Sequence, residues 1–124
     1  MAESNKKGIE FRGIKVVALP VVDSARAERF YGEVLGLPVA VEAGEPCGYL
    51  VGETILMLKP DWYAPPSAEP SPRITLIVDD ARVTERRLKE QEVVIADPPK
   101  SDGNGYFASF LDSEGNKLWF CSYV

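Results

Sequence analysis

Two stretches of the chain share one pattern of apolar and polar positions, an apolar run that stops at an aspartate and continues as an amphipathic segment. The first copy starts at residues 16–23 and the second at residues 73–80. The positions that match without a gap are Val17/Ile74, Leu19/Leu76, Val21/Val78, Asp23/Asp80, Glu28/Glu85 and Arg29/Arg86. Such an apolar run predicts a strand covered on both faces. The repeat predicts two copies of one supersecondary unit, each too small to bury its own apolar face, with a ligand pocket at their seam.

The first unit, residues 9–59, is predicted to fold as β-α-β-β-β. Its first strand spans about 14–22, and Asp23 or Ser24 can cap the helix that follows. The apolar face of this helix is predicted to comprise Ala27, Phe30, Tyr31, Val34 and Leu35. Gly36 suits the left-handed position that ends a helix. Turn residues then separate three short strands near residues 37–43, 47–51 and 54–59.

The second unit, residues 73–124, repeats this order. We predict a strand at 73–79, a helix at 80–91, and strands near 92–96, 105–112 and 117–123. Glu92 stands where a helix-ending glycine is expected. The units are joined by residues 60–72, whose five prolines exclude a helix or a continuous strand ladder. Residues 1–8 are polar and predict a short disordered arm.

Charge and composition exclude several classes of partner. The net charge of −5 argues against nucleic acid, since phosphate binding needs a basic face. No apolar run approaches the roughly 20 residues of a membrane span, and the start of the chain lacks the apolar stretch of a signal peptide. Cys47 and Cys121 stand in no metal or redox spacing, which favours two reduced thiols. We therefore expect a cytoplasmic protein.

Several motifs, taken together, carry a resemblance to a known family. They are Val17-Ala-Leu-Pro-Val-Val-Asp23, Phe30-Tyr31, Val34-Leu35-Gly36-Leu37, Val78-Asp79-Asp80 and Phe110-Leu-Asp-Ser-Glu-Gly-Asn116. With them the chain resembles the vicinal oxygen chelate superfamily, which comprises glyoxalases, bleomycin-resistance proteins and extradiol dioxygenases, over about residues 10–123. The resemblance implies an α+β fold in which two tandem β-α-β-β-β modules form a curved mixed sheet around a cleft.

The resemblance also implies where a divalent metal would bind in catalytic members, through His and Glu at four strand positions. Here those positions hold Val16, Arg73, Trp119 and either Leu56 or Met57. None of these side chains suits a hard or borderline cation, and the chain has no histidine. We therefore expect no metal, no cofactor and no catalytic residue, which argues against an enzyme.

The same positions indicate which side chains face the cleft, because side chains alternate along a strand. The expected ligand-binding set is Val16, Ala18, Tyr49, Met57, Trp62, Tyr63, Arg73, Thr75, Phe107, Ser109, Trp119 and Cys121. A register shifted by one residue would place Leu56 in the cleft instead of Met57. Trp119 either fills the cleft or offers a stacking surface for a planar ligand. Arg73, if buried, needs an anionic partner from the protein or from the ligand.

Three hypotheses follow for function. The leading one is a metal-free protein, similar to bleomycin-resistance proteins, that binds a small organic molecule such as an antibiotic or aromatic metabolite and is a homodimer. The second is an isomerase or lyase of the same superfamily, with Lys117 or Tyr106 as a general base; Ser109 has no histidine to activate it. The third is a ligand-free dimeric scaffold. The charge of the ligand stays open, since Arg73 favours an anion and the net charge favours a cation.

Overall fold

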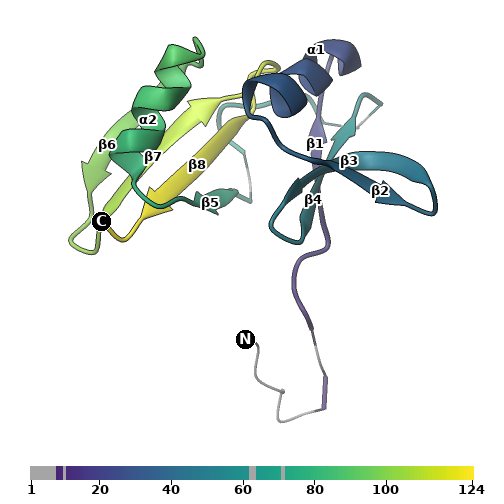
Figure 1. Cartoon of the computed structure of the whole chain (residues 1–124), viewed down its shortest axis with the longest axis horizontal. Coiled ribbons are helices and arrows are strands. Elements are labelled where there is room, and N and C mark those ends of the chain that lie inside the picture. Colours follow the sequence, from purple (N-terminus) through teal and green to yellow (C-terminus); the bar gives the residue numbers. More distant parts are fainter. Residues whose placement is uncertain (1–7, 10, 62–63, 71) are drawn as a thin grey trace.

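In a computed structural model, residues 8–9, 11–61, 64–70 and 72–124 are described. The first module contains one four-stranded sheet in the order β1-β4-β3-β2 and one helical segment (Figure 1). Its elements are β1 (Val16–Pro20), α1 (Ser24–Arg29), a π-helical turn η1 (Phe30–Val34), β2 (Val39–Glu42), β3 (Glu45–Val51) and β4 (Thr54–Lys59). β1 is parallel to β4, and the other pairs are antiparallel.

The second module repeats this topology with a sheet in the order β5-β8-β7-β6, in which β5 is parallel to β8. Its elements are β5 (Thr75–Ile77), α2 (Ala81–Glu90), β6 (Ile95–Ser101), β7 (Tyr106–Leu111) and β8 (Lys117–Ser122). The two mixed sheets are curved and do not close into a barrel. The predicted α+β fold of tandem β-α-β-β-β modules is confirmed. The expected disordered arm lies almost entirely outside the described residues.

The ends of the helices follow the local sequence. Asp23 caps α1 by accepting from the Arg26 N–H at 3.0 Å, and Asp80 caps α2 by accepting from the Arg82 N–H at 2.9 Å. Gly36 ends the first helical segment with a φ of 69°. Glu92 adopts the same left-handed conformation with a φ of 62°, although it has a Cβ atom. Both helical segments are therefore followed by a residue in the left-handed conformation, although the second of these residues is not a glycine.

Two elements differ from the sequence prediction. The helix of the first module changes to π geometry at its end, where the Leu35 N–H donates to the Phe30 carbonyl at 2.9 Å. The strand predicted at 92–96 begins only at Ile95 and continues through Pro98 and Pro99 to residue 101. Prolines are tolerated there because β6 is an edge strand and pairs with β7 alone.

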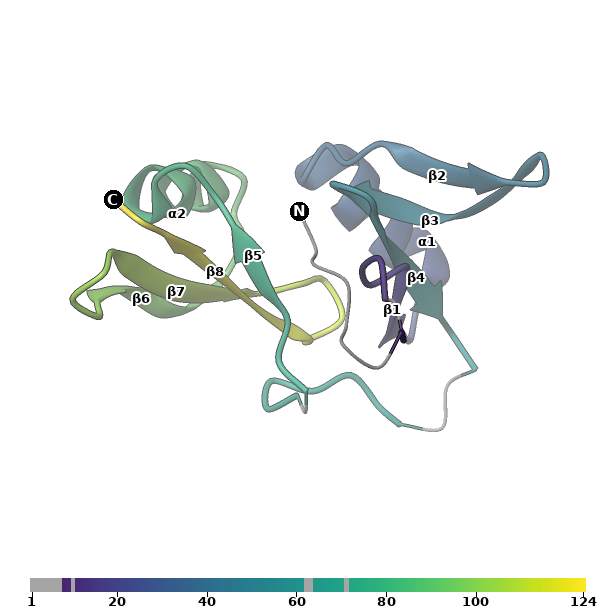
Figure 2. The same cartoon turned by 90° about the horizontal axis from the view of Figure 1, so that it is seen from below.

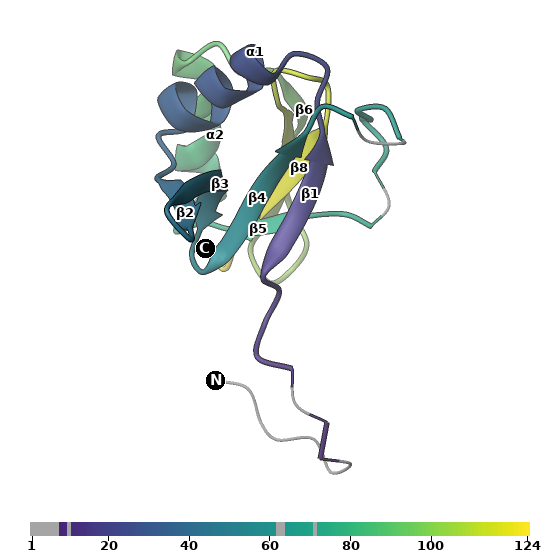
Figure 3. The same cartoon turned by 90° about the vertical axis from the view of Figure 1, so that its right-hand side faces the viewer.

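One apolar core joins the two modules. Figure 3 shows both helices on the same side of β1, β4 and β8. The end of the first helical segment reaches both sheets: Phe30 packs on Phe110 of β7 with ring centroids 6.3 Å apart, and Tyr31 stacks on Tyr49 of β3 at 6.2 Å. Tyr31 is fully buried. Neither module buries its apolar face alone, as the repeat predicted.

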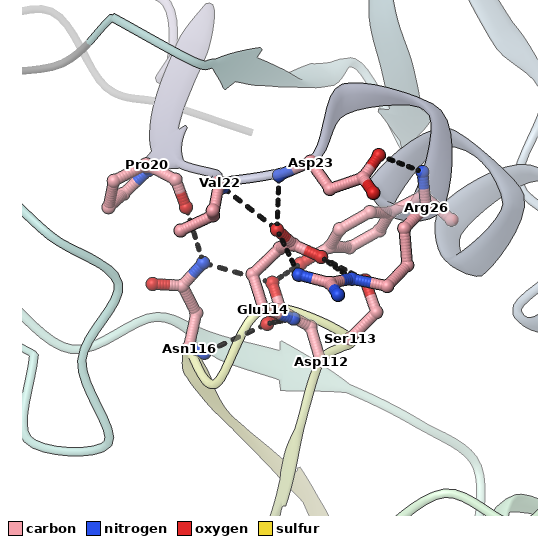
Figure 4. Close-up of polar contacts among 9 residues, drawn as sticks. Pro20, Val22, Asp23, Arg26, Asp112, Ser113, Glu114 and Asn116 are labelled. Atoms are coloured by element: carbon pink, nitrogen blue, oxygen red, sulfur yellow. Dashed lines mark hydrogen bonds and ion pairs between the residues drawn. The ribbon is translucent and has the colours of Figure 1, made fainter.

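The turn between β7 and β8, residues 112–116, binds the first module through side-chain oxygens (Figure 4). We call it the inter-module turn. Asp112 accepts from the Tyr31 hydroxyl at 2.7 Å, and its other oxygen accepts from the N–H groups of Glu114 and Asn116. The Asn116 amide donates to the Pro20 carbonyl at 2.8 Å, at the end of β1. Burial, together with the Asp112 carboxylate, raises the pKa of the Tyr31 hydroxyl well above its ordinary value.

Glu114 makes the densest set of these contacts. Its side chain is inaccessible to solvent, and its carboxylate accepts from the backbone N–H groups of Val22 and Asp23, both at 2.8 Å. The Arg26 guanidinium donates to both carboxylate oxygens, at 2.7 and 3.1 Å. The hydrogen bond from Arg26 is the largest cause that lowers the pKa of the Glu114 carboxyl, to about 2. Glu114 is therefore ionised at neutral pH, and its negatively charged carboxylate binds the start of α1.

Replacing Glu114 with Gln should lower the free energy of unfolding at neutral pH by about 2 kcal/mol, because the ion pair and charge-assisted hydrogen bonds are lost. The pKa of this carboxyl in the folded chain is about 2, against an ordinary 4.5. Its stabilisation is therefore complete above the ordinary value and is lost as the pH falls toward 2. Urea denaturation across this range should show a smaller loss of stability in Glu114→Gln than in the parent chain.

Glu53→Gln is the matched control, since Glu53 is an exposed residue in the turn between β3 and β4. It should leave both the stability and its dependence on acid pH close to those of the parent chain. The assignment would be wrong if Glu114→Gln lost stability with falling pH as steeply as the parent.

Candidate functional site: a groove between two edge strands

A groove of about 940 Å³ lies between the free edges of β1 and β5. Figure 2 shows β1 with β4 on one side and β5 with β8 on the other, with the connecting segment passing below them. The groove is lined along the whole length of both edge strands and by six residues of that segment, which are Ala64, Pro65, Ser67, Glu69, Pro70 and Pro72. Most of its lining side chains are apolar. Such a groove can enclose a small organic molecule.

The parallel registers settle which residue of β4 corresponds to Trp119. Ala18 of β1 pairs with Met57, and its counterpart in the repeat, Thr75 of β5, pairs with Trp119. Met57 is therefore the equivalent of Trp119. Leu56 belongs to the core and is only 2% exposed. Of the two residues that the sequence left open, Leu56 lines the groove and Met57 does not, although Met57 is the one equivalent to Trp119.

The four positions implied for a metal are thus Val16, Met57, Arg73 and Trp119. A valine and an indole ring offer no lone pair to a cation, and a guanidinium repels one. A single thioether suits only a soft metal. Within the part of the chain that the structure describes, no three His, Cys, Asp or Glu side chains gather where they could hold an ion. These residues do not fit the metal of the family's catalytic members.

The predicted ligand-binding residues divide into groups. Val16, Ala18, Arg73 and Thr75 line the groove together. Phe107, Ser109, Trp119 and Cys121 lie on β7 and β8, next to the groove, and do not line it. Trp62 and Tyr63 lie outside the described residues.

Tyr49 does not lie where the sequence predicted it. Its ring packs in the core on Tyr31, and its hydroxyl donates to the Glu28 carbonyl at 3.2 Å. Tyr49 pairs with Leu56, so both side chains point to the helix side of the sheet. Tyr49 and Met57 both line a hollow of about 290 Å³ that is separate from the groove.

Trp119 lies beneath two cations. The Arg73 guanidinium carbon is 4.0 Å from the centroid of its ring, and the Lys117 ammonium is 5.1 Å away. Phe107 packs beside it with ring centroids 6.0 Å apart. Trp119 is only 8% exposed. It therefore neither fills the groove nor presents a bare ring to it, and its contact with the groove is made through Arg73 and Lys117, which both line the groove.

Asp97 of β6 is a site residue that the sequence analysis missed. It pairs with Ser109 on β7, accepts from the buried Ser109 hydroxyl, and forms an ion pair with Lys117 at 2.9 Å. The hydrogen bond from Ser109, followed by that from Lys117, lowers the pKa of the Asp97 carboxyl. The strand predicted near residues 92–96 ended just before Asp97, whereas β6 runs from Ile95 to Ser101. Because an edge strand tolerates proline, a strand that continues through Pro98 and Pro99 would have included Asp97 in the prediction.

The two candidate general bases are engaged in other contacts. The Lys117 ammonium is bound to Asp97, and the Tyr106 ring lies under the Arg82 guanidinium at 4.4 Å. Tyr106 does not line the groove. The arrangement therefore offers cations, hydrogen-bond donors and apolar surface to a ligand.

These features define a two-module α+β protein with an apolar groove between its modules and two cations at the edge of that groove. The chain belongs to the Glyoxalase/Bleomycin resistance protein/Dioxygenase superfamily, whose family model matches residues 13–120. The resemblance drawn from the sequence is confirmed. No significant match is found among curated protein sequences.

Solved structures with the same fold include proteins of different described functions. TnmS3, an antibiotic binding protein from Streptomyces sp. CB03234, is 22% identical, with a TM-score of 0.73 over 94% of this chain and 99% of that one. A glyoxalase/bleomycin resistance protein from the same strain is 27% identical, with a TM-score of 0.67 over 89% and 100%. Lactoylglutathione lyase from Agrobacterium tumefaciens is 19% identical, with a TM-score of 0.67 over 90% and 93%. The shared fold therefore does not choose between binding and catalysis.

The metal positions can be tested by installing ligands. We expect no stoichiometric Zn²⁺ or Ni²⁺ binding to the parent chain by calorimetry. The fourfold variant Val16→His, Met57→His, Arg73→His, Trp119→Glu should bind Zn²⁺, because it restores ligand types at all four equivalent positions.

The matched control replaces Leu56 instead of Met57 with His in the same background. It should bind Zn²⁺ at least about tenfold more weakly, since residue 56 lies on the opposite face of β4 from residue 57 and its imidazole would point away from the other three ligands. Equal affinities of the two variants, each folded by circular dichroism, would contradict the register.

Proposed function

We propose that the chain binds a small organic molecule, such as an antibiotic or an aromatic metabolite, in the groove between β1 and β5, and does so without a metal and without transforming it. The observation that carries this proposal is the groove itself, with a volume of about 940 Å³ and a largely apolar lining. A cavity of this size and lining is typical of small-molecule sites. The chemistry of Val16, Met57, Arg73 and Trp119 supports a ligand held without metal coordination.

The comparisons with solved structures support a small molecule as the class of ligand. TnmS3 is described as an antibiotic binding protein, and its fold covers nearly all of this chain. At 22% identity this likeness concerns the fold alone. The identity of the ligand therefore has to come from the residues of this groove.

The proposed function includes a cytoplasmic homodimer. Its support is the apolar surface that precedes β1, where Ile9, Phe11 and Ile14 are 54%, 81% and 69% exposed. Burying such side chains against a second copy would be favourable by about 1.5–3 kcal/mol each. None of the helices among the described residues is long and apolar enough to cross a membrane.

Ligand binding can be tested with the uncharged fluorescent probe 1-aminoanthracene. Its emission should rise and shift to the blue when it enters the groove. Ala18→Trp should abolish this change, because Ala18 lines the groove and an indole would occupy it. Ala25→Trp is the matched control, since Ala25 is exposed on α1. Absence of any emission change with the parent chain would reject the proposal.

Dimerisation can be tested by sedimentation equilibrium. The parent chain should sediment at twice the mass of one chain, and the double variant Phe11→Glu, Ile14→Glu should sediment at the mass of one chain. The control Val39→Glu changes an exposed valine on β2 and should remain dimeric. A parent chain that is monomeric at every concentration would contradict this part of the proposal.

A further inference from the structure

We infer that the groove selects an anionic aromatic ligand, a carboxylate or phenolate on a planar ring, and that the Arg73 guanidinium binds the anionic group. This inference rests on the proposed function, and it assigns a ligand class to the same groove. It begins from the charges at the rim. The cations that line the groove among the described residues are Arg73 and Lys117.

The two cations share a single nearby carboxylate. Asp97 is 2.9 Å from the Lys117 ammonium and also accepts from the buried Ser109 hydroxyl. Its charge is therefore committed to Lys117. Arg73 forms no ion pair with any residue that the structure describes, and the contact it makes is with the Trp119 ring. Glu69, the acidic residue among the described groove lining, is exposed.

Stacking leaves Arg73 able to bind an anion. A guanidinium contacts an aromatic ring with its face, whereas its N–H donors point outward in its plane. Contact with Trp119 at 4.0 Å therefore restrains the cation without occupying the donors that grip a carboxylate. Because its orientation is already restrained, Arg73 loses less side-chain freedom when a ligand binds.

The rest of the groove favours an aromatic body. Val16, Ala18 and Ile77 supply apolar surface on the two edge strands. The outer face of the Arg73 guanidinium is a flat surface on which a ring can stack. An apolar body beside a cation that has no ion-pair partner among the described residues suits an amphipathic molecule with a single negative charge.

The acidic net charge of the chain does not oppose this inference. Exposed charges, Arg73 among them, are screened by salt over about 8–10 Å, so a ligand in direct contact with the Arg73 guanidinium interacts with it more strongly than with the distant charges of the chain. The conflict between the net charge of −5 and Arg73 is therefore decided by the residues at the groove. The charged residues that line it are two cations, Arg73 and Lys117, and the exposed Glu69, while Asp97 beside it is paired with Lys117.

The test is displacement of 1-aminoanthracene by 2-naphthoate and by 2-naphthamide, which have the same ring and differ in charge. 2-Naphthoate should bind at least about tenfold more tightly to the parent chain, as expected for a charge-assisted hydrogen bond. Arg73→Gln should remove this preference while 2-naphthamide still displaces the probe. Arg73→Lys keeps the positive charge and loses the planar guanidinium that can donate two parallel hydrogen bonds to a carboxylate. It should reduce the preference without abolishing it.

The matched control is Arg82→Gln. Arg82 also lies over an aromatic ring, that of Tyr106 at 4.4 Å, and it does not line the groove. Its replacement should leave the preference unchanged. Equal binding of the two naphthalene compounds to the parent chain, or an unchanged preference in Arg73→Gln, would overturn the inference and leave the proposed function standing. If 1-aminoanthracene and both competitors fail to bind, the proposed function falls and this inference falls with it.

Discussion

The buried carboxylate of Glu114 is the contact on which the relation between the two modules depends. It takes two backbone N–H groups and one guanidinium from the start of α1, which lies far away in sequence. Asp112 and Asn116 in the same turn bind Tyr31 and the end of β1. A carboxylate shielded from water needs several hydrogen-bond donors of this kind. Because these donors come from the first module, the contacts of the inter-module turn favour one arrangement of the two modules.

The groove follows from this arrangement. Asn116 holds the carbonyl of Pro20 at one end of β1, and the backbone of Lys117 donates to Ser67 in the connecting segment at 3.0 Å. The two free edge strands are therefore positioned by polar contacts near one end, and apolar side chains line the space between them. The groove and the inter-module turn are neighbours because both belong to the seam of the repeat.

The sequence predicted most of the fold for reasons that are local. Period-two and helical patterns, the capping aspartates and Gly36 all act within a few residues, and the element order was confirmed. The site was harder to predict. Tyr49 was expected at the cleft and lies in the core, because the register of β3 against β4 decides its face. Asp97 was missed because its strand continues through two prolines at an edge.

The sequence by itself determined the repeat, the two modules and the unsuitability of the metal positions, since these depend on residue types and spacing within each unit. Only the tertiary structure decided that Met57 corresponds to Trp119, that Trp119 lies beneath Arg73 and Lys117, and that Asp97 neutralises Lys117. These relations are made between strands, where a shift of one residue exchanges the two faces and where side chains distant in sequence compete for the same partner.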